Sequence, residues 1–304
     1  MLADLDIPPR SGNSYEWADF AELRAVAHPD HCFSKGDLDG IARRGKDTGG
    51  GFDVETGWRD IINTIGNRRV AFAGSYPFTL SDDNDTILLQ NHEYEAQYMY
   101  LGLLVAACMR NIMKSHQGAV ARAFEQISLK VFSSLMPPGS EVRATWAQAG
   151  KDAPYVGSLY KKLIQIARDI RCNPTFKADD FSDRDTGDGG IDIIAWHPMS
   201  DARDGIPIAF AQCGCSKDGW GHKQFDAAPA RHQSRLPARH LWANYYFLPV
   251  DLRRSDGDWA HKSELAAAIF VDRLRLLGLA AEFGIFGEMP EMPFIANALS
   301  AHYA

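Results

Sequence analysis

The sequence predicts an α/β protein in which a mixed central sheet is flanked by helices and joined to a mainly helical N-terminal region. Apolar residues recur at helical spacing over residues 117–135 and 155–170, which predicts two amphipathic helices. Three short apolar runs between residues 191 and 250 have the length and composition of buried strands. Helices followed by strands and a further helix indicate an α/β core, and 304 residues are enough to bury one.

The first 115 residues form a predicted accessory domain with a pattern of its own. Helices are predicted over residues 16–27 and 54–69, and short apolar segments flank the polar turn at residues 81–85, as in a β-hairpin. A helix followed by a hairpin is compatible with a winged-helix-like module and equally with a small interaction domain. The sequence favours neither of these two interpretations.

Residues 116–304 form the second predicted domain. Pro137 and Pro138 end its first helix, because proline cannot continue a helical hydrogen-bond pattern. Its predicted elements are helices over residues 117–135 and 155–170, an acidic loop with a glycine pair over residues 179–190, strands over residues 191–196, 207–213 and 241–250, and a last helix over residues 262–277.

The composition limits the class of protein. Hydrophobic residues make up 45% and charged residues 23% of the chain, which is typical of a globular protein rather than a disordered or fibrous one. The most apolar stretch, residues 98–109, is shorter than the roughly 18 residues of a membrane span, so we expect a buried helix and no membrane partner. The N-terminus lacks the basic start and apolar run of a signal peptide, which makes the cytoplasm the expected location.

A basic segment stands out against the net charge of −7. Contact with nucleic acid would have to be local in a chain of this charge. Residues 217–240 carry five cations and only two acids; the cations are Lys217, Lys223, Arg231, Arg235 and Arg239. Most such runs are simply solvated surface. The segment lies directly after the motif described below, so Lys217, Arg231, Arg235 and Arg239 are candidate DNA-binding residues.

Asp192 is the candidate centre of the chemistry. It is the single carboxylate of an otherwise apolar strand, and a buried carboxylate is costly unless it is paired or bound to a metal. On the next strand, side-chain alternation places Gln212 and Gly214 on one face and Cys213 and Cys215 on the other. An aspartate beside a polar residue on an adjacent strand is an arrangement with which nucleases hold a magnesium ion against a scissile phosphate.

The glycine-aspartate loop of residues 187–192, followed about twenty residues later by residues 210–213, resembles the Mrr-type restriction endonucleases of the PD-(D/E)xK superfamily. The resemblance covers roughly residues 117–250. It implies a restriction-endonuclease-like core in which Asp192 is the principal ligand of Mg²⁺ or Mn²⁺. It also implies that Gln212 takes the metal-binding position of the second strand and that Glu125 is the upstream acid on the preceding helix.

Gly214 departs from that family pattern, which has a lysine two residues after the glutamine or glutamate. The family lysine stabilises developing negative charge, and a glycine cannot. Lys223 is the favoured substitute and Lys217 the alternative, with Gly214 leaving room for the incoming side chain. For Lys223 to reach the site, a helix has to begin near Trp220 and pack beside the strand of Gln212.

The resulting expectation is a metal-dependent endodeoxyribonuclease, because the segment from Gln212 to Lys223 also resembles proteins of prokaryotic defence against foreign DNA. DNA, a defence-system partner protein and further copies of the same chain are the expected partners. The alternative is a catalytically inactive subunit that keeps the nuclease fold to bind DNA or a partner. Cys213 and Cys215, with two downstream histidines, do not have a usual zinc-finger spacing, so buried inert thiols are expected there.

Overall fold

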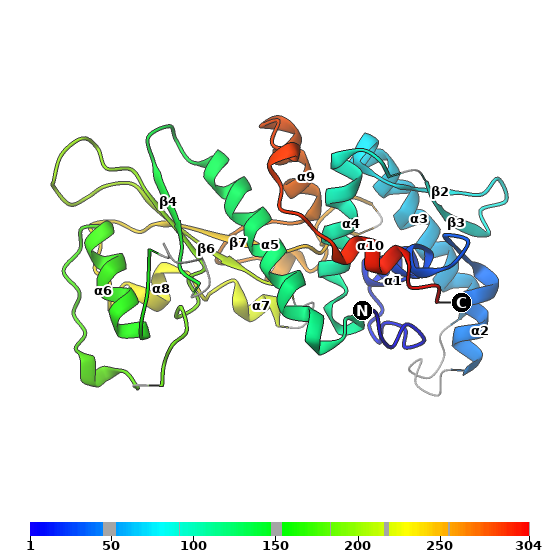
Figure 1. Cartoon of the computed structure of the whole chain (residues 1–304), viewed down its shortest axis with the longest axis horizontal. Coiled ribbons are helices and arrows are strands. Elements are labelled where there is room, and N and C mark those ends of the chain that lie inside the picture. Colours follow the sequence, from blue (N-terminus) through cyan, green and yellow to red (C-terminus); the bar gives the residue numbers. More distant parts are fainter. Residues whose placement is uncertain are drawn as a thin grey trace.

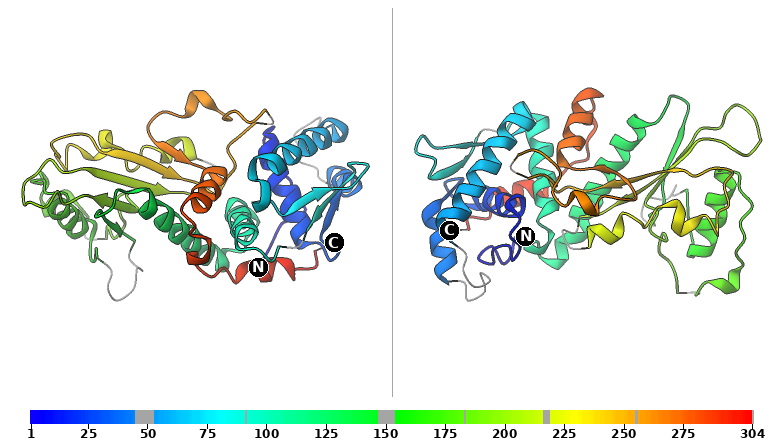
Figure 2. Two further views of the ribbon diagram at one scale, coloured as in Figure 1. Left: turned by 90° about the horizontal axis from the view of Figure 1, so that it is seen from above. Right: turned by 180° about the vertical axis from the view of Figure 1, so that it is seen from behind.

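The computed structural model describes residues 1–44, 53–90, 92–146, 154–182, 184–215, 219–254 and 256–303. These residues form ten α-helices and two β-sheets in an elongated molecule (Figure 1). A five-stranded sheet lies toward one end and a mainly helical region toward the other, which the two further views in Figure 2 also show. The predicted mixed α/β class is confirmed. Among the described residues, no helix is both long and apolar enough to cross a membrane.

The N-terminal region contains the predicted helices and hairpin together with elements that the sequence pattern did not indicate. Its elements are α1 (Ser14–Ala27), β1 (Cys32–Ser34), α2 (Lys35–Arg44), α3 (Val54–Phe72), β2 (Phe78–Leu80), β3 (Thr86–Leu89) and α4 (Glu95–Ala107). The hairpin strands β2 and β3 pair antiparallel, and β1 adds to β3 to give the order β1-β3-β2. Helix α4 is the expected buried apolar helix.

The large sheet is mixed, as predicted. Its strands are β4 (Glu141–Ala144), β5 (Ile193–Trp196), β6 (Ile208–Cys213), β7 (Ala243–Phe247) and β8 (Ile269–Val271), in the order β4-β5-β6-β7-β8. The pairs β4–β5 and β5–β6 are antiparallel, whereas the pairs β6–β7 and β7–β8 are parallel. The sequence predicted β5, β6 and β7, but not the two short edge strands.

Helices cover both faces of this sheet. Helix α5 (Lys114–Leu135) packs Phe124 and Ile127 against the face that carries Ala209 and Ala211. The opposite face carries Phe210 and packs against α6 (Leu159–Asp169) and the short helix α8 (Pro229–His232). This alternation along β6 follows from strand geometry and fixes which face each site residue can reach.

The helix predicted over residues 262–277 is wrong. The chain forms a short 3₁₀ turn at Lys262–Glu264, the edge strand β8, and then α9 (Arg273–Glu282). Residues 269–271 are β-branched or aromatic and pair with β7, so a strand replaces the middle of the predicted helix. The side chain of Asp272 accepts a hydrogen bond from the backbone nitrogen of Arg275 at 3.1 Å and thereby caps α9.

The end of the chain returns to the N-terminal region. Helix α10 (Phe294–Leu299) packs on α1 and α4 (Figure 1), and the backbone nitrogen of Tyr303 donates to the carbonyl of Ala27 at 2.8 Å. One hydrophobic core extends from α1 through α4 and α5 to α9. The predicted boundary after residue 115 falls in the first turn of α5, which packs on α4, and it stays a prediction.

A buried network of charges joins the N-terminal helices to the segments around α9. The guanidinium of Arg68 on α3 lies 2.9 Å from Asp19, 2.8 Å from Glu22 and 2.9 Å from Asp251. Arg273, the first residue of α9, lies 3.0 Å from Asp19 and 3.8 Å from Glu22. All five side chains are almost completely buried.

Candidate active site

Asp192 lies directly before β5 and is 6% exposed. Its backbone nitrogen donates to the carbonyl of Ala211 at 2.9 Å, and its Oδ2 accepts from the backbone nitrogen of Cys213 at 2.6 Å. Burial raises the pKa of Asp192 well above its usual range, as do the negative charges of Asp188 and Glu125, against the opposing effect of the Cys213 amide. Two further carboxyl groups, Asp188 and Glu125, therefore act on Asp192 at the start of β5.

The glycine-aspartate loop holds Asp188 in this group. Gly189 and Gly190 have φ angles of 72° and 87°, in the left-handed region that favours glycine. A β-carbon on residue 190 would come within 2.8 Å of the side chain of Asp226, so the loop packs closely against the turn that precedes α8. Asp188 forms a turn contact, in which its Oδ1 accepts from the backbone nitrogen of Gly190 at 2.8 Å. Its electrostatic effect on Asp192 was not predicted.

Glu125 projects from α5 and is half-buried. Its nearest cation is Arg122, one helical turn earlier, at 3.4 Å. Burial raises the pKa of Glu125, the Arg122 guanidinium lowers it, and the charge of Asp188 raises it again, with a net rise. The structure thus brings Glu125 from the preceding helix toward Asp192, as the resemblance implied.

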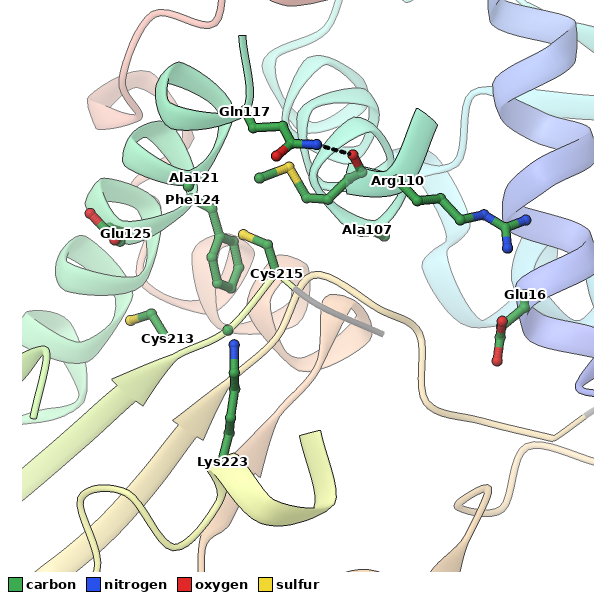
Figure 3. Close-up of a pocket in the computed structure, with 12 residues that line it drawn as sticks. Glu16, Ala107, Arg110, Gln117, Ala121, Phe124, Glu125, Cys213, Cys215 and Lys223 are labelled. Atoms are coloured by element: carbon green, nitrogen blue, oxygen red, sulfur yellow. Dashed lines mark hydrogen bonds between the residues drawn. The ribbon is translucent and has the colours of Figure 1, made fainter. Parts of the chain in front are cut away.

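A cavity of about 490 Å³ opens beside Glu125 and Cys213, whereas Asp192 and Asp188 do not line it. It lies between α5, the end of β6, the short helix α7 (Trp220–Lys223) and the N-terminal region (Figure 3). The residues that line it are Glu16, Ala107, Met109, Arg110, Gln117, Ala121, Phe124, Glu125, Cys213, Gly214, Cys215 and Lys223. Two residues predicted for the site, Glu125 and Lys223, therefore share one cavity. Arg110 and Glu16 enter it from a region for which the sequence indicated no catalytic role.

Lys223 reaches the cavity from the helix that its proposed role required. Helix α7 begins at Trp220, which is buried against Phe270 as a core residue. Gln224 anchors the helix, because its Nε2 donates to the carbonyl of Glu264 at 2.7 Å and its Oε1 accepts from the backbone nitrogen of Ala266 at 3.0 Å. The Lys223 side chain points toward the end of β6, between Cys213 and Cys215 (Figure 3), and forms no ion pair with any described residue. Lys217 lies outside the described residues.

The space beside Gly214 is filled by Tyr246 and not by a lysine. A β-carbon on residue 214 would overlap the Tyr246 hydroxyl and lie 3.0 Å from its Cζ. The Tyr246 side chain is fully buried, and its hydroxyl has no hydrogen-bond partner among the described residues. Gly214 is therefore required by the tyrosine on β7, which nothing in the local pattern of β6 could indicate.

Gln212 takes a different position from Glu125. It pairs in register with Tyr246, and alternation along β6 places it on the face of Phe210, away from α5. It does not line the cavity. Its Nε2 donates to the carbonyl of Cys213 at 3.3 Å, whereas its buried Oε1 accepts no hydrogen bond from any described residue. The role of Gln212 as a metal ligand stays a prediction, to which the structure adds one unsatisfied oxygen.

The three described arginines of the basic segment have partners of their own. Arg231 forms an ion pair with Asp226, and the Nε of Arg239 lies 2.7 Å from Asp204. The guanidinium of Arg235 lies 5.4 Å from the ring centroid of Phe181. Arg239 sits near Ile208, at the start of β6, whereas Lys223 lies at its other end, roughly 17 Å away along a strand of six residues. The structure does not bring Arg239 together with the candidate site.

Carboxylate and amide oxygens are donors that suit Mg²⁺ or Mn²⁺. Asp192, Asp188 and Glu125 supply such oxygens, although the described residues contain no group of three His, Cys, Asp or Glu side chains already arranged around a metal position. Burial raises the pKa of the Cys213 thiol, in line with the buried thiols expected at this position. No protein-family model, curated protein or solved structure matches the chain.

Proposed function

We propose that this chain is a metal-dependent endodeoxyribonuclease that hydrolyses DNA phosphodiester bonds. The observation that carries the proposal is the buried Asp192 carboxylate, which lies near two further acids. One of them, Glu125, lines a cavity together with Lys223, which has no ion-pair partner among the described residues. Burying like charges together is unfavourable, and a divalent cation relieves that cost. The same cation needs oxygen ligands, which these acids provide.

Asp192 and Glu125 would hold Mg²⁺ or Mn²⁺, with the unsatisfied Oε1 of Gln212 or a nearby backbone oxygen as a further candidate. When bound, the cation would polarise the scissile phosphate and lower the pKa of its water. The hydrogen bond from the Cys213 amide orients the Asp192 carboxylate and leaves its second oxygen for the metal. Buried ligands with fixed orientation lose little freedom when the metal binds.

Lys223 would stabilise the negative charge that develops on the phosphate. Its ammonium is half-buried and has no acidic partner among the described residues, so its charge stays available to a substrate. Gln224 and Trp220 fix the helix on which it stands. A preorganised cation of this kind stabilises the transition state more than the bound substrate.

On the sequence resemblance, we further propose that the chain belongs to the Mrr-type group of the PD-(D/E)xK superfamily and acts in defence against foreign DNA. The order of its elements is compatible with that group. A helix carrying the acid precedes three antiparallel strands, and the glycine-aspartate loop enters the middle one. A short helical segment follows β6 before the parallel strand β7. Under this proposal, DNA is the substrate, and a defence-system protein and further copies of the chain are the partners.

A specific observation favours the alternative of an inactive subunit that binds DNA or a partner protein. Tyr246 occupies the place beside Gly214 where the family has a lysine side chain, so that lysine cannot be restored without rebuilding β7. If Lys223 does not substitute for it, the fold would bind without cutting. Cleavage itself distinguishes the two proposals.

The test is cleavage of plasmid and linear DNA by the full chain with Mg²⁺ or Mn²⁺, compared with chelator alone. We expect Asp192→Ala to abolish cleavage without unfolding the protein, because it removes a ligand and also a buried charge. Lys223→Ala should lower the rate about 10²- to 10³-fold with nearly unchanged affinity, and Lys217→Ala should do much less. Cleavage by Asp192→Ala at the parent rate would overturn the assignment, and a parent that never cleaves would favour the binding subunit.

A further inference from the structure

The N-terminal region forms one wall of the candidate active-site cavity. Glu16 on α1 and Arg110, in the turn between α4 and α5, face the cavity from that side, and Lys223 faces it from the core (Figure 3). A substrate in this cavity would therefore touch both regions. The sequence indicated DNA contacts only for residues 217–240.

The turn that carries Arg110 is held firmly in place. The Nε2 of Gln117 donates to the carbonyls of Met109 and Ile112, each at 3.0 Å. The side chain of Asn111 donates to the carbonyl of Asp4 at 3.1 Å. These bonds fix the backbone on both sides of Arg110, so that its side chain starts from a defined position.

The guanidinium of Arg110 is exposed and free of acidic partners. Its one hydrogen bond within the described residues goes to the carbonyl of Ile7 at 3.5 Å, and it forms no ion pair with any of them. By contrast, Arg231 and Arg239 are each paired with an aspartate. An arginine without a counterion can give its full charge to a phosphate, whereas a paired arginine first has to give up its carboxylate.

We infer that Arg110 binds a backbone phosphate of the DNA, which lies in the cleft between the N-terminal region and the core. The inference rests on the proposed function and adds to it a substrate-binding residue from outside the nuclease-like core. Lys223 acts on the phosphate that reacts, and Arg110 holds a neighbouring one. Glu16, in the same wall, faces the bound strand with a negative charge and weakens its binding.

The experiment is DNA binding by the full chain, measured by fluorescence anisotropy in chelator over a series of salt concentrations. Arg110→Ala should weaken binding roughly five- to tenfold at low salt and reduce the slope of log affinity against log salt by about one. At the same low salt concentration, Glu16→Gln should strengthen DNA binding about two- to threefold. Arg239→Ala is the matched control, because it removes an exposed arginine that already has a partner, and it should leave the slope unchanged.

The outcomes separate the inference from the proposed function. If Arg110→Ala keeps the parent slope while Arg239→Ala flattens it, DNA lies on the outer surface and the inference fails, although the nuclease proposal stands. If the parent cleaves DNA but Arg110→Ala lowers kcat at unchanged KM, Arg110 acts on the reacting phosphate and the inference again fails. A parent that binds no DNA at any salt concentration overturns both.

Discussion

The surroundings of Arg68 and of Asp192 both bury ionisable side chains, but they differ in the charge of the groups next to each buried carboxylate. Around Arg68, each carboxylate faces an arginine or a tyrosine hydroxyl; Glu22, for example, accepts from Tyr76 at 2.7 Å and from Tyr100 at 2.8 Å. Around Asp192, the neighbour that acts most strongly on the carboxylate is another acid, Asp188, and no charged side chain of the described residues opposes it. The first place compensates its charges, and the second does not.

The difference separates a structural role from a functional one. Burial alone would lower the pKa of Arg68, but Glu22, Asp19 and Asp251 raise it well above its usual value, so the guanidinium stays charged. That network joins α1, α3 and α9 and needs no ligand. Buried like charges instead destabilise the protein, which is the reason for the cation that we propose at Asp192.

The largest expected effect is on the compensated network. Arg68→Ala should lower the free energy of unfolding by about 3–5 kcal/mol, because it leaves three carboxylates buried without their common partner. Chemical denaturation in urea would measure it. Arg69→Ala is the matched control, since Arg69 is the exposed neighbour on α3 and should change stability by less than about 0.5 kcal/mol. A loss below 1 kcal/mol for Arg68→Ala would contradict a structural role.

A buried polar group without a partner provides the next test. Gly214→Ala should cost about 1–3 kcal/mol, because its β-carbon overlaps the Tyr246 hydroxyl in a packed core. Tyr246→Phe alone should be neutral or slightly stabilising, since that hydroxyl has no hydrogen-bond partner among the described residues. The double variant should recover part of the loss, and thermal melts of all three would show it. Strictly additive effects would mean that the two residues do not interact.

The Asp192 site should change the stability of the protein with pH in the opposite direction to a carboxylate that is paired with a cation. Because the pKa of Asp192 is raised in the folded state, the folded protein holds this proton more tightly than the unfolded chain does. The resulting stability is complete below about pH 4, where an aspartate in an unfolded chain titrates, and is lost as pH rises through the folded pKa. Asp192→Asn should therefore gain about 1–2 kcal/mol over the parent near pH 8 in chelator.

The matched control for that measurement is Glu22→Gln, which breaks the compensated network and should destabilise the protein at the same pH. Mg²⁺ should restore the parent by mass action and leave Asp192→Asn unchanged. Urea denaturation at several pH values, with and without Mg²⁺, would follow both effects. A parent that is more stable than Asp192→Asn at pH 8 in chelator would mean that Asp192 has a positive partner.

The sequence predicted the features that depend on local pattern. Helix α5 follows from the spacing of Phe124, Ile127 and Val131, and α7 begins at Trp220, where the proposed role of Lys223 required it. Strand β8 was missed because three residues become a strand only by pairing with β7. The charged network was missed because Asp19 and Glu22 lie on α1, where acids are ordinarily solvated, and only the packing of α3, α4 and α9 buries them.

The site followed the same division. Asp192 could be chosen from residue type and context and Glu125 from the family resemblance, whereas Asp188, Tyr246 and Arg110 reach the candidate site through contacts between distant segments. Gly214 shows why the sequence alone could not explain the site. Its absence of a side chain was visible in the sequence, but the reason for it lies on β7, some thirty residues later.

The smallest expected effect concerns the basic segment. The sequence predicts that Arg231→Ala with Arg235→Ala flattens the salt dependence of DNA binding by up to about one unit per lost phosphate contact. Because Arg231 is paired with Asp226 and Arg235 lies over Phe181, we now expect a change well below one unit for the pair. Asp226→Asn is the more sensitive variant, because it removes the ion-pair partner of Arg231. It should steepen the salt dependence of DNA binding if this surface lies near DNA. Anisotropy titrations would compare the three proteins. If the slope of log affinity against log salt fell by two units in the double variant, ion pairing would not prevent an arginine from binding DNA. Arg231 and Arg235 would then contact phosphates, as the sequence predicted.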